Sequence, residues 1–217
     1  MPRKSSKKSS FYADVALSSA SVEWGTPEWL PLALLKACGT EQFGTDPCCG
    51  DEWASRVPAA VRYTEADDGL TRPWAGPVFC NPPYKRYVIE RWLMRCLLAW
   101  QSGEAGLVFA LVPARTDCAY WRDSIIGHAD VLFLKGRLRF GDGVDPAPFP
   151  SALVVWGADA LLLARVRAAF PGAAWMPKDQ FPTAMANPRA KGSARSRAGV
   201  RAARGGGARE RSSKGGR

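Results

Sequence analysis

The chain has 217 residues, 47% of them hydrophobic, and it carries 30 Lys and Arg against 20 Asp and Glu, a formal net charge of +10. This length predicts one domain of ordinary size with tails, and the apolar content is sufficient for a buried core. No uncharged apolar stretch approaches the roughly 20 residues that a membrane-spanning helix needs, and residues 1–8 lack the apolar core of a secretory signal.

The cysteines and the single histidine argue against a metal site. The six cysteines show no Cys-x-x-Cys spacing, and His128 is distant from them in sequence. We therefore expect no metal and assign His128 a structural role. Scattered thiols without an export signal are typical of a reducing compartment, so we expect a cytoplasmic protein.

The positive charge is concentrated at the two ends of the chain. Residues 1–10 carry +4, and residues 183–217 carry ten Lys or Arg against one Glu, which leaves −3 for residues 11–182. We expect a basic disordered N-terminus over 1–10, a folded domain over 11–182, and a disordered Arg/Gly-rich tail over 183–217. Such a tail can serve solubility alone, but its arginine content favours binding to nucleic acid.

The first half of the folded part predicts two helices and two strands. Thr26 is suited to cap a helix, Pro27 to occupy its first position and Gly39 to stop it after the apolar residues 29–38. A short strand follows over 42–45 and ends at Asp46. A helix start over 50–55, a strand over 61–63 and a turn over 67–69 come next.

The second half alternates apolar runs with segments of helical periodicity. The runs predict strands and the periodic segments predict helices: strands over 78–80, 107–112, 131–134 and 152–156, and helices over 86–99, 119–126 and 161–170. Alternating strands and helices, with the strands apolar on both faces, predict an α/β fold with a mostly parallel sheet flanked by helices.

The segment Asn81-Pro82-Pro83-Tyr84 ends the strand that begins near Val78. Each proline fixes its own φ near −65° and cannot continue a sheet, and Asn81 is held extended because it precedes a proline. The turn therefore presents the Asn81 side-chain amide, the Pro82 carbonyl and the Tyr84 ring in a nearly fixed arrangement. Two hydrogen-bond acceptors and an aromatic ring suit a flat ligand ring that bears an amine, such as adenine.

Two further turns are expected at the same edge of the sheet. They are residues 46–50 and 67–69, and each follows a predicted strand. Ligands of open α/β sheets bind beyond the carboxyl ends of the strands, so these turns are candidates for a ligand site. Either Asp46 or Asp68 could accept hydrogen bonds from a ligand, and the sequence does not decide between them.

These motifs carry a resemblance to a known family. The order Thr26-Pro27, then 46–50, then 81–84 resembles S-adenosylmethionine-dependent amino-methyltransferases. With Trp24-Gly25-Thr26-Pro27, residues 113–117 followed by Tyr120-Trp121, and residues 136–140, the chain more closely resembles phage-type DNA N6-adenine methyltransferases, the Dam-like family, over about residues 24–157. One departure is Glu52, which stands where many methyltransferases have a second glycine of the cofactor loop.

The resemblance implies a Rossmann-like methyltransferase fold, S-adenosylmethionine as cofactor and double-stranded DNA as substrate, with the target base flipped into the pocket of residues 81–84. Catalysis is then assigned to Asn81, Pro82, Pro83 and Tyr84. Cofactor binding is assigned to Thr26, Pro27, Asp46, Pro47, Cys48, Gly50 and Asp68. DNA binding is assigned to Trp24, Arg115, Arg137, Arg195, Arg197, Arg201 and Arg204.

Alternative functions stay open on the sequence. The same chemistry could act on cytosine N4, on an RNA base or on a protein glutamine, and an inactive methyltransferase fold could serve only to bind nucleic acid. Cys48 follows a proline, as the nucleophile of cytosine-C5 enzymes does, but it falls in the cofactor loop and is not assigned to catalysis. No insertion is large enough for a separate target-recognition domain, so we expect short or relaxed specificity, read near Arg115 and between Phe140 and Phe149.

Overall fold

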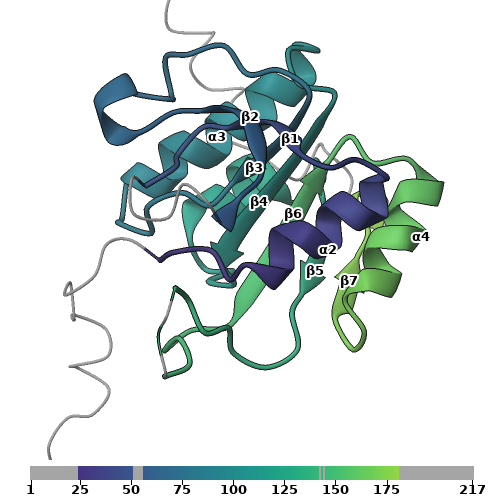
Figure 1. Ribbon diagram of the computed structural model, residues 1–217. Coiled ribbons are helices and arrows are strands. Elements are labelled where there is room, and N and C mark those ends of the chain that lie inside the picture. Colours follow the sequence, from purple (N-terminus) through teal and green to yellow (C-terminus); the bar gives the residue numbers. More distant parts are fainter. Residues whose placement is uncertain (1–23, 51–55, 142, 144, 181–217) are drawn as a thin grey trace, which may run out of the picture. The chain divides into compact units, whose positions relative to one another are not determined.

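The computed structural model describes residues 24–50, 56–141, 143 and 145–180 (Figure 1). The described part contains three α-helices, seven strands and three short helical turns: helices α2 (Trp29–Cys38), α3 (Val88–Gln101) and α4 (Ala160–Ala169); strands β1 (Phe43–Asp46), β2 (Ala59–Arg62), β3 (Pro77–Cys80), β4 (Leu107–Pro113), β5 (Asp130–Phe133), β6 (Ser151–Trp156) and β7 (Ala174–Met176); and turns η2 (Glu65–Asp67), η3 (Trp121–Ile125) and η4 (Lys178–Gln180).

The strands form one mixed sheet in the order β2-β1-β3-β4-β6-β5-β7. The pairs β1–β2, β1–β3 and β3–β4 are parallel, whereas β4–β6, β5–β6 and β5–β7 are antiparallel. The predicted α/β class is confirmed, but the expectation of a mostly parallel sheet is only partly correct. The difference arises because β5 and β6 are joined by the loop 134–150 without a crossover helix, so β6 returns antiparallel beside β5.

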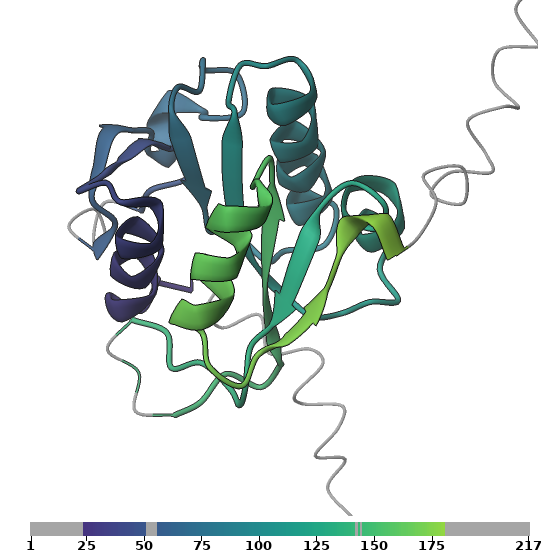
Figure 2. The same ribbon diagram turned by 90° about the vertical axis from the view of Figure 1, so that its right-hand side faces the viewer.

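Helices cover both faces of the sheet. The helices α2 and α4 pack together on one face, and α3 lies with η3 on the other (Figures 1 and 2). Strand β4 shows why both faces are apolar: Phe109 and Leu111 belong to the core under α2 and α4, and their neighbours Val108 and Val112 belong to the core under α3.

The start of α2 differs from the prediction. The helix begins at Trp29, its N-cap residue is Glu28, and no side chain caps it. Pro27 therefore precedes the cap instead of occupying the first helical position, and its carbonyl accepts a hydrogen bond from Leu30 N at 3.0 Å. Thr26 does not cap the helix because its hydroxyl accepts a hydrogen bond from Asn81. The predicted stop is confirmed: Gly39 has φ 74° and its N–H donates to Leu35 O.

Smaller differences concern the ends of elements. Strand β2 begins two residues earlier than predicted, and the predicted helix 119–126 is reduced to the π-helical turn Trp121–Ile125. Edge strand β7 was not predicted, because it has only three residues, largely exposed, between Gly172 and Pro177. Most of the predicted helix start over 50–55 lies outside the described residues. Among the described residues no helix is long and apolar enough to cross a membrane.

Candidate active site

The topology of the sheet creates a crevice between β1 and β3. From β1 the chain passes to β2 on one side and then returns across β1 to β3 on the other side. The carboxyl ends of β1 and β3 are therefore neighbours whose connections leave in opposite directions. This switch point is the place where open α/β sheets bind ligands. Strand β1 ends at Asp46, and β3 ends directly before Asn81.

A cavity of about 690 Å³ opens at this switch point, a volume in the range of small-molecule and cofactor sites. It brings together most of the residues predicted for the site. Those in its lining are Trp24, Thr26, Asp46, Pro47, Cys48, Gly50, Asp68, Asn81, Pro82 and Pro83. Of the predicted catalytic and cofactor residues, Pro27 and Tyr84 are not in the lining.

Hydrogen bonds fix the orientation of the Asn81 side chain. Its Nδ2 donates to the backbone oxygen of Trp24 at 2.5 Å and to Thr26 Oγ1 at 3.0 Å. Its Oδ1 accepts a hydrogen bond from the Tyr84 hydroxyl at 2.7 Å. An amide oxygen has two lone pairs, so one acceptor position of Oδ1 stays free for a ligand. No described residue donates to the carbonyl of Pro82, which is the second acceptor of the turn.

Tyr84 stands behind Asn81 in an aromatic cluster with Trp24, Phe140 and Phe149. Its ring meets Phe140 and Phe149 edge-on, with centroids 6.1 and 5.6 Å apart, and Trp24 meets the same two rings at 5.3 and 5.0 Å. Its hydroxyl also donates to Leu111 O at 3.1 Å. Burial raises the pKa of Tyr84 well above its usual value, so the phenol is neutral and acts as a donor.

Asp46 is a buried acid in the wall of the cavity. Its side chain is only 4% exposed, and its Oδ1 accepts a hydrogen bond from Cys48 N at 3.3 Å. Burial raises the pKa of Asp46 to about 7, against smaller lowering effects of the Cys48 amide and the Arg62 charge. The carboxyl is therefore poised to gain or lose its proton near neutrality, and a cationic ligand would favour the charged form.

Two thiols lie in contact beside the Asn-Pro-Pro-Tyr turn. Cys48 Sγ and Cys80 Sγ are 3.6 Å apart, and neither forms a disulfide. Burial raises the pKa of both Cys48 and Cys80, so both remain protonated at neutral pH. A protonated thiol is a weak nucleophile, which supports leaving Cys48 out of the chemistry.

Three charged residues of the cavity lining were not predicted from the sequence: Glu65, Lys85 and Arg91. Glu65 comes three residues after the end of β2, and an acid near this strand end is where dinucleotide-binding folds hold a ribose hydroxyl. That position was the available signal, but the prediction named Asp68 in the following turn. Its neighbour Asp67 accepts hydrogen bonds from Thr64 N and Oγ1, both at 2.9 Å, and so stabilises the turn.

The predicted DNA-binding residues are only partly described. Arg115 is exposed, and its guanidinium lies 5.5 Å from the centre of the Phe149 ring, next to the aromatic cluster. Arg137 lines a different cavity, beyond β5. The four predicted tail residues lie outside the described residues: Arg195, Arg197, Arg201 and Arg204.

No group of three or more His, Cys, Asp or Glu side chains suited to a metal ion occurs in the part of the chain that the structure describes.

Comparison with known proteins gives one match. The family model for DNA N-6-adenine-methyltransferase (Dam) matches residues 16–152. No curated protein and no solved structure matches the chain. A match over more than half of the sequence, with the Asn-Pro-Pro-Tyr turn at its centre, shows that the chain belongs to the DNA N-6-adenine-methyltransferase (Dam) family.

Proposed function

We propose that this protein transfers a methyl group from S-adenosylmethionine to the N6 amine of adenine in double-stranded DNA. The observation that carries the proposal is the oriented Asn81 amide beside the free Pro82 carbonyl, both in the wall of the cavity at the β1–β3 switch point. Family membership supports the same reaction.

The two acceptors match the needs of an aromatic amine. The lone pair of the exocyclic nitrogen of adenine is delocalised into the ring, which makes this nitrogen a poor nucleophile. Asn81 Oδ1 and the Pro82 carbonyl can each accept one N–H of the amine, which orients the nitrogen and returns electron density to it. Thr26 and Trp24 keep the amide from rotating, so the oxygen is already in place before the base arrives.

The lining of the cavity has the chemistry that S-adenosylmethionine requires. When bound, this cofactor supplies a methyl group on a positively charged sulfur. Asp46, Glu65 and Asp68 offer acceptors for its ammonium group and ribose hydroxyls, and Lys85 and Arg91 offer cations for its carboxylate. Apolar side chains such as Val57 and Leu70 in the same lining can cover an adenine ring.

Access to the amine requires the base to leave the duplex, because the N6 nitrogen cannot be approached in line within a base pair. The aromatic cluster of Trp24, Tyr84, Phe140 and Phe149 lies directly beside Asn81. We assign to this cluster, through Trp24 in the lining of the cavity, the contact that fixes the plane of the extruded base. Tyr84 lies behind the lining, and its hydroxyl steadies the Asn81 oxygen.

The decisive experiment is Asn81→Ala. The variant should lose methyl transfer by at least about 100-fold, because the oriented acceptor is gone, while its affinity for DNA stays close to that of the wild type. Transfer is measured as labelled methyl incorporation from S-adenosylmethionine. Gln101→Ala, an exposed position at the end of α3, is the matched control and should leave transfer unchanged. Wild-type transfer rates in the Asn81→Ala variant would refute the catalytic assignment.

The alternative substrates are separated in the same assay. Wild-type protein is offered DNA, RNA and protein in parallel, and the modified DNA is digested to nucleosides. Label in N6-methyladenine supports the proposal, whereas label in N4-methylcytosine, in RNA or in glutamine assigns the same turn to another amine. DNA binding without any incorporation would favour an inactive methyltransferase fold.

A further inference from the structure

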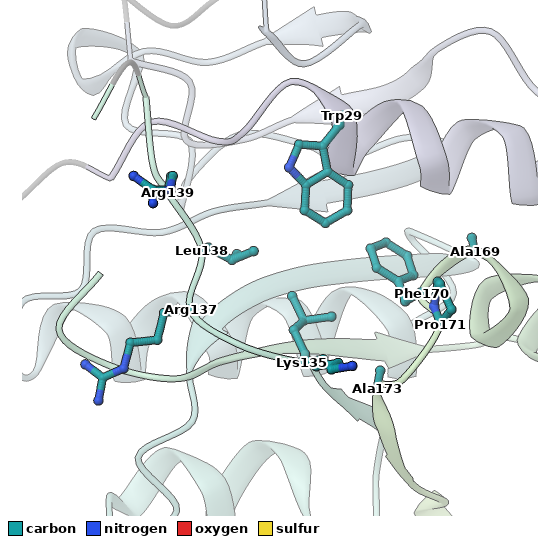
Figure 3. Close-up of a pocket in the computed structure, with 10 residues that line it drawn as sticks. Trp29, Lys135, Arg137, Leu138, Arg139, Ala169, Phe170, Pro171 and Ala173 are labelled. Atoms are coloured by element: carbon teal, nitrogen blue, oxygen red, sulfur yellow. The ribbon is translucent and has the colours of Figure 1, made fainter. Parts of the chain in front are cut away.

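A second cavity, of about 350 Å³, lies beyond the carboxyl end of β5 (Figure 3). Its walls come from the loop after β5, the first residue of α2, and the segment between α4 and β7. The lining residues include three cations, Lys135, Arg137 and Arg139, and no acid. This is a notable concentration in a folded part whose net charge is negative.

The three cations have little to bind within the protein. All three are exposed, and in the part of the chain that the structure describes none forms an ion pair. Arg137 Nη1 donates to Ala147 O at 3.3 Å, which leaves most of its guanidinium free. The aliphatic stem of Lys135 packs on Gly172, where an added Cβ would lie 2.9 Å from Lys135 Cδ. The three cations thus stand at every second position of one loop, and no acid in the cavity lining balances them.

The middle of the cavity is apolar and aromatic. Figure 3 shows Trp29, Leu138 and Phe170 around its centre, with the cationic side chains at its margin. The Trp29 ring is 52% exposed and stands 5.9 Å from the Phe170 ring. An exposed tryptophan bordered by unpaired cations suits a ligand that has both apolar faces and repeated negative charges, which is the chemistry of a nucleic-acid strand.

This cavity and the candidate active site lie at the same edge of the sheet. Strands β1, β3, β4 and β5 run in the same direction, so their carboxyl ends meet at one edge. The loop after β5 is joined to the active-site segment by a hydrogen bond from Gly141 N to Gly25 O at 2.6 Å and by the packing of Phe140 on Trp24. Arg115, which follows β4, stands between the two places along this edge.

We infer that Lys135, Arg137 and Arg139 bind the phosphate backbone of the DNA strand beside the target base, with Trp29 against its sugar or base. This inference rests on the proposed function, because the active site supplies the reason for DNA to lie along this edge. Three strand spacings separate β3 from β5 in the sheet order, which is about 14 Å. At a rise of about 3.4 Å per nucleotide, the contacted phosphates lie roughly four nucleotides from the extruded base.

The test compares two triple variants of the full-length chain that lose the same amount of charge. The first is Lys135→Gln, Arg137→Gln, Arg139→Gln. The control is Lys36→Gln, Arg122→Gln, Arg165→Gln, three exposed cations outside both cavities. DNA affinity is measured against salt concentration with a duplex of defined sequence. The cavity variant should bind DNA at least about 10-fold more weakly than the wild type. The slope of log affinity against log salt concentration should fall in magnitude by about two to three. The control should lose clearly less affinity and less slope.

Two further measurements separate the possible failures. S-adenosylmethionine binding and thermal unfolding should be the same in the cavity variant and the control, which excludes loss of folding. A Lys135→Gln, Arg139→Gln double variant spares the Arg137–Ala147 hydrogen bond and should lose up to about two from the slope. Equal DNA affinity and equal slopes in the cavity variant and control would overturn this inference alone. Absence of methyl transfer in the wild type would overturn the proposed function, and DNA binding would still report on the cavity.

Discussion

Asn81 is fixed by residues that are far away in the sequence. Its two N–H groups are taken by Trp24 O and Thr26 Oγ1, more than fifty positions upstream, and its oxygen receives the Tyr84 hydroxyl. A side-chain amide in water turns freely, so these contacts determine which atom faces the ligand. Thr26 therefore acts as a positioning residue in this site.

Replacing Thr26 by Val should lower kcat about 10-fold to 100-fold. Valine has the same shape but leaves one N–H of Asn81 without an acceptor, so the amide is less well held. The KM for DNA should change little. Thr26→Ser keeps the hydroxyl and should restore most of kcat, which a purely structural need for the threonine methyl would not allow. Equal turnover of the Val and Ser variants would remove Thr26 from the positioning of Asn81.

Asp46 makes the folded state sensitive to pH. Burial raises its pKa to about 7, above the ordinary aspartate value that it has in the unfolded chain. The folded state therefore binds the proton more tightly, and its contribution to stability falls as pH rises from about 4 to about 7. At pH 8 the buried charge lowers the free energy of unfolding by up to about 4 kcal/mol.

Asp46→Asn should therefore stabilise the protein at pH 8 and have a much smaller effect near pH 4, as measured by urea unfolding at both pH values. The same variant should bind S-adenosylmethionine more weakly at pH 8, since it cannot supply a negative charge to a cation. Asp67→Asn is the matched control, because Asp67 faces the Thr64 turn and lies outside the cavity. A wild-type stability that does not fall between pH 4 and pH 7, relative to Asp46→Asn, would contradict the assignment.

At the scale of single elements, the sequence best predicts the features that depend on residues close together in the chain. Apolar runs identify the central strands, Gly39 marks the end of α2, and the Asn-Pro-Pro turn marks the end of β3. The turns of the candidate site come directly after these strands. The predicted strand ends therefore located both Asp46 and Asn81 at the candidate site. Each of these features depends on neighbours within a few positions.

The direction of β6 could not be obtained from its own residues. Its six positions are all buried, and a continuous apolar run looks the same in a parallel and an antiparallel strand. Direction is decided by the preceding connection. The segment 134–150 contains glycines and prolines without helical periodicity, and this was the available signal for an antiparallel return beside β5.

Thr26 shows the limit of local rules within an element. A threonine before Pro-Glu fits the start of a helix, yet the structure gives its hydroxyl to Asn81 and leaves α2 without a side-chain cap. The competing partner lies 55 positions away and becomes visible only when β3 is placed beside β1. Glu65 was not predicted for a related reason, because its place in the cavity lining depends on where β2 ends.

At the scale of the whole molecule, charge is divided between the ends and the body. Residues 183–217 contribute +9 and residues 11–182 contribute −3. We propose that the tail increases DNA affinity by counterion release, while the folded part positions the base. The tail would then raise the affinity for DNA and leave the rate of methyl transfer unchanged.

Deleting residues 187–217 should weaken DNA binding and flatten its salt dependence, with turnover at saturating DNA close to that of the full chain. A chain of full length with Arg195, Arg197, Arg201 and Arg204 replaced by Gln is the matched control for loss of charge without loss of length. Both variants should shift the salt slope in the same direction. An unchanged slope in the deletion variant would exclude the tail from DNA binding.

The antiparallel return from β5 to β6 also has a consequence for how this family can diversify. Because Phe133 and Ala152 are paired neighbours, the segment between these strands leaves and re-enters the sheet at the same rim, beside the catalytic turn. No strand pairing depends on its length. Phe140 and Phe149 tie the two arms of this segment to Trp24 and Tyr84, so length and sequence can vary between these two rings. A graft of residues 141–146 from a relative should therefore change the recognised bases while the proposed site keeps its geometry.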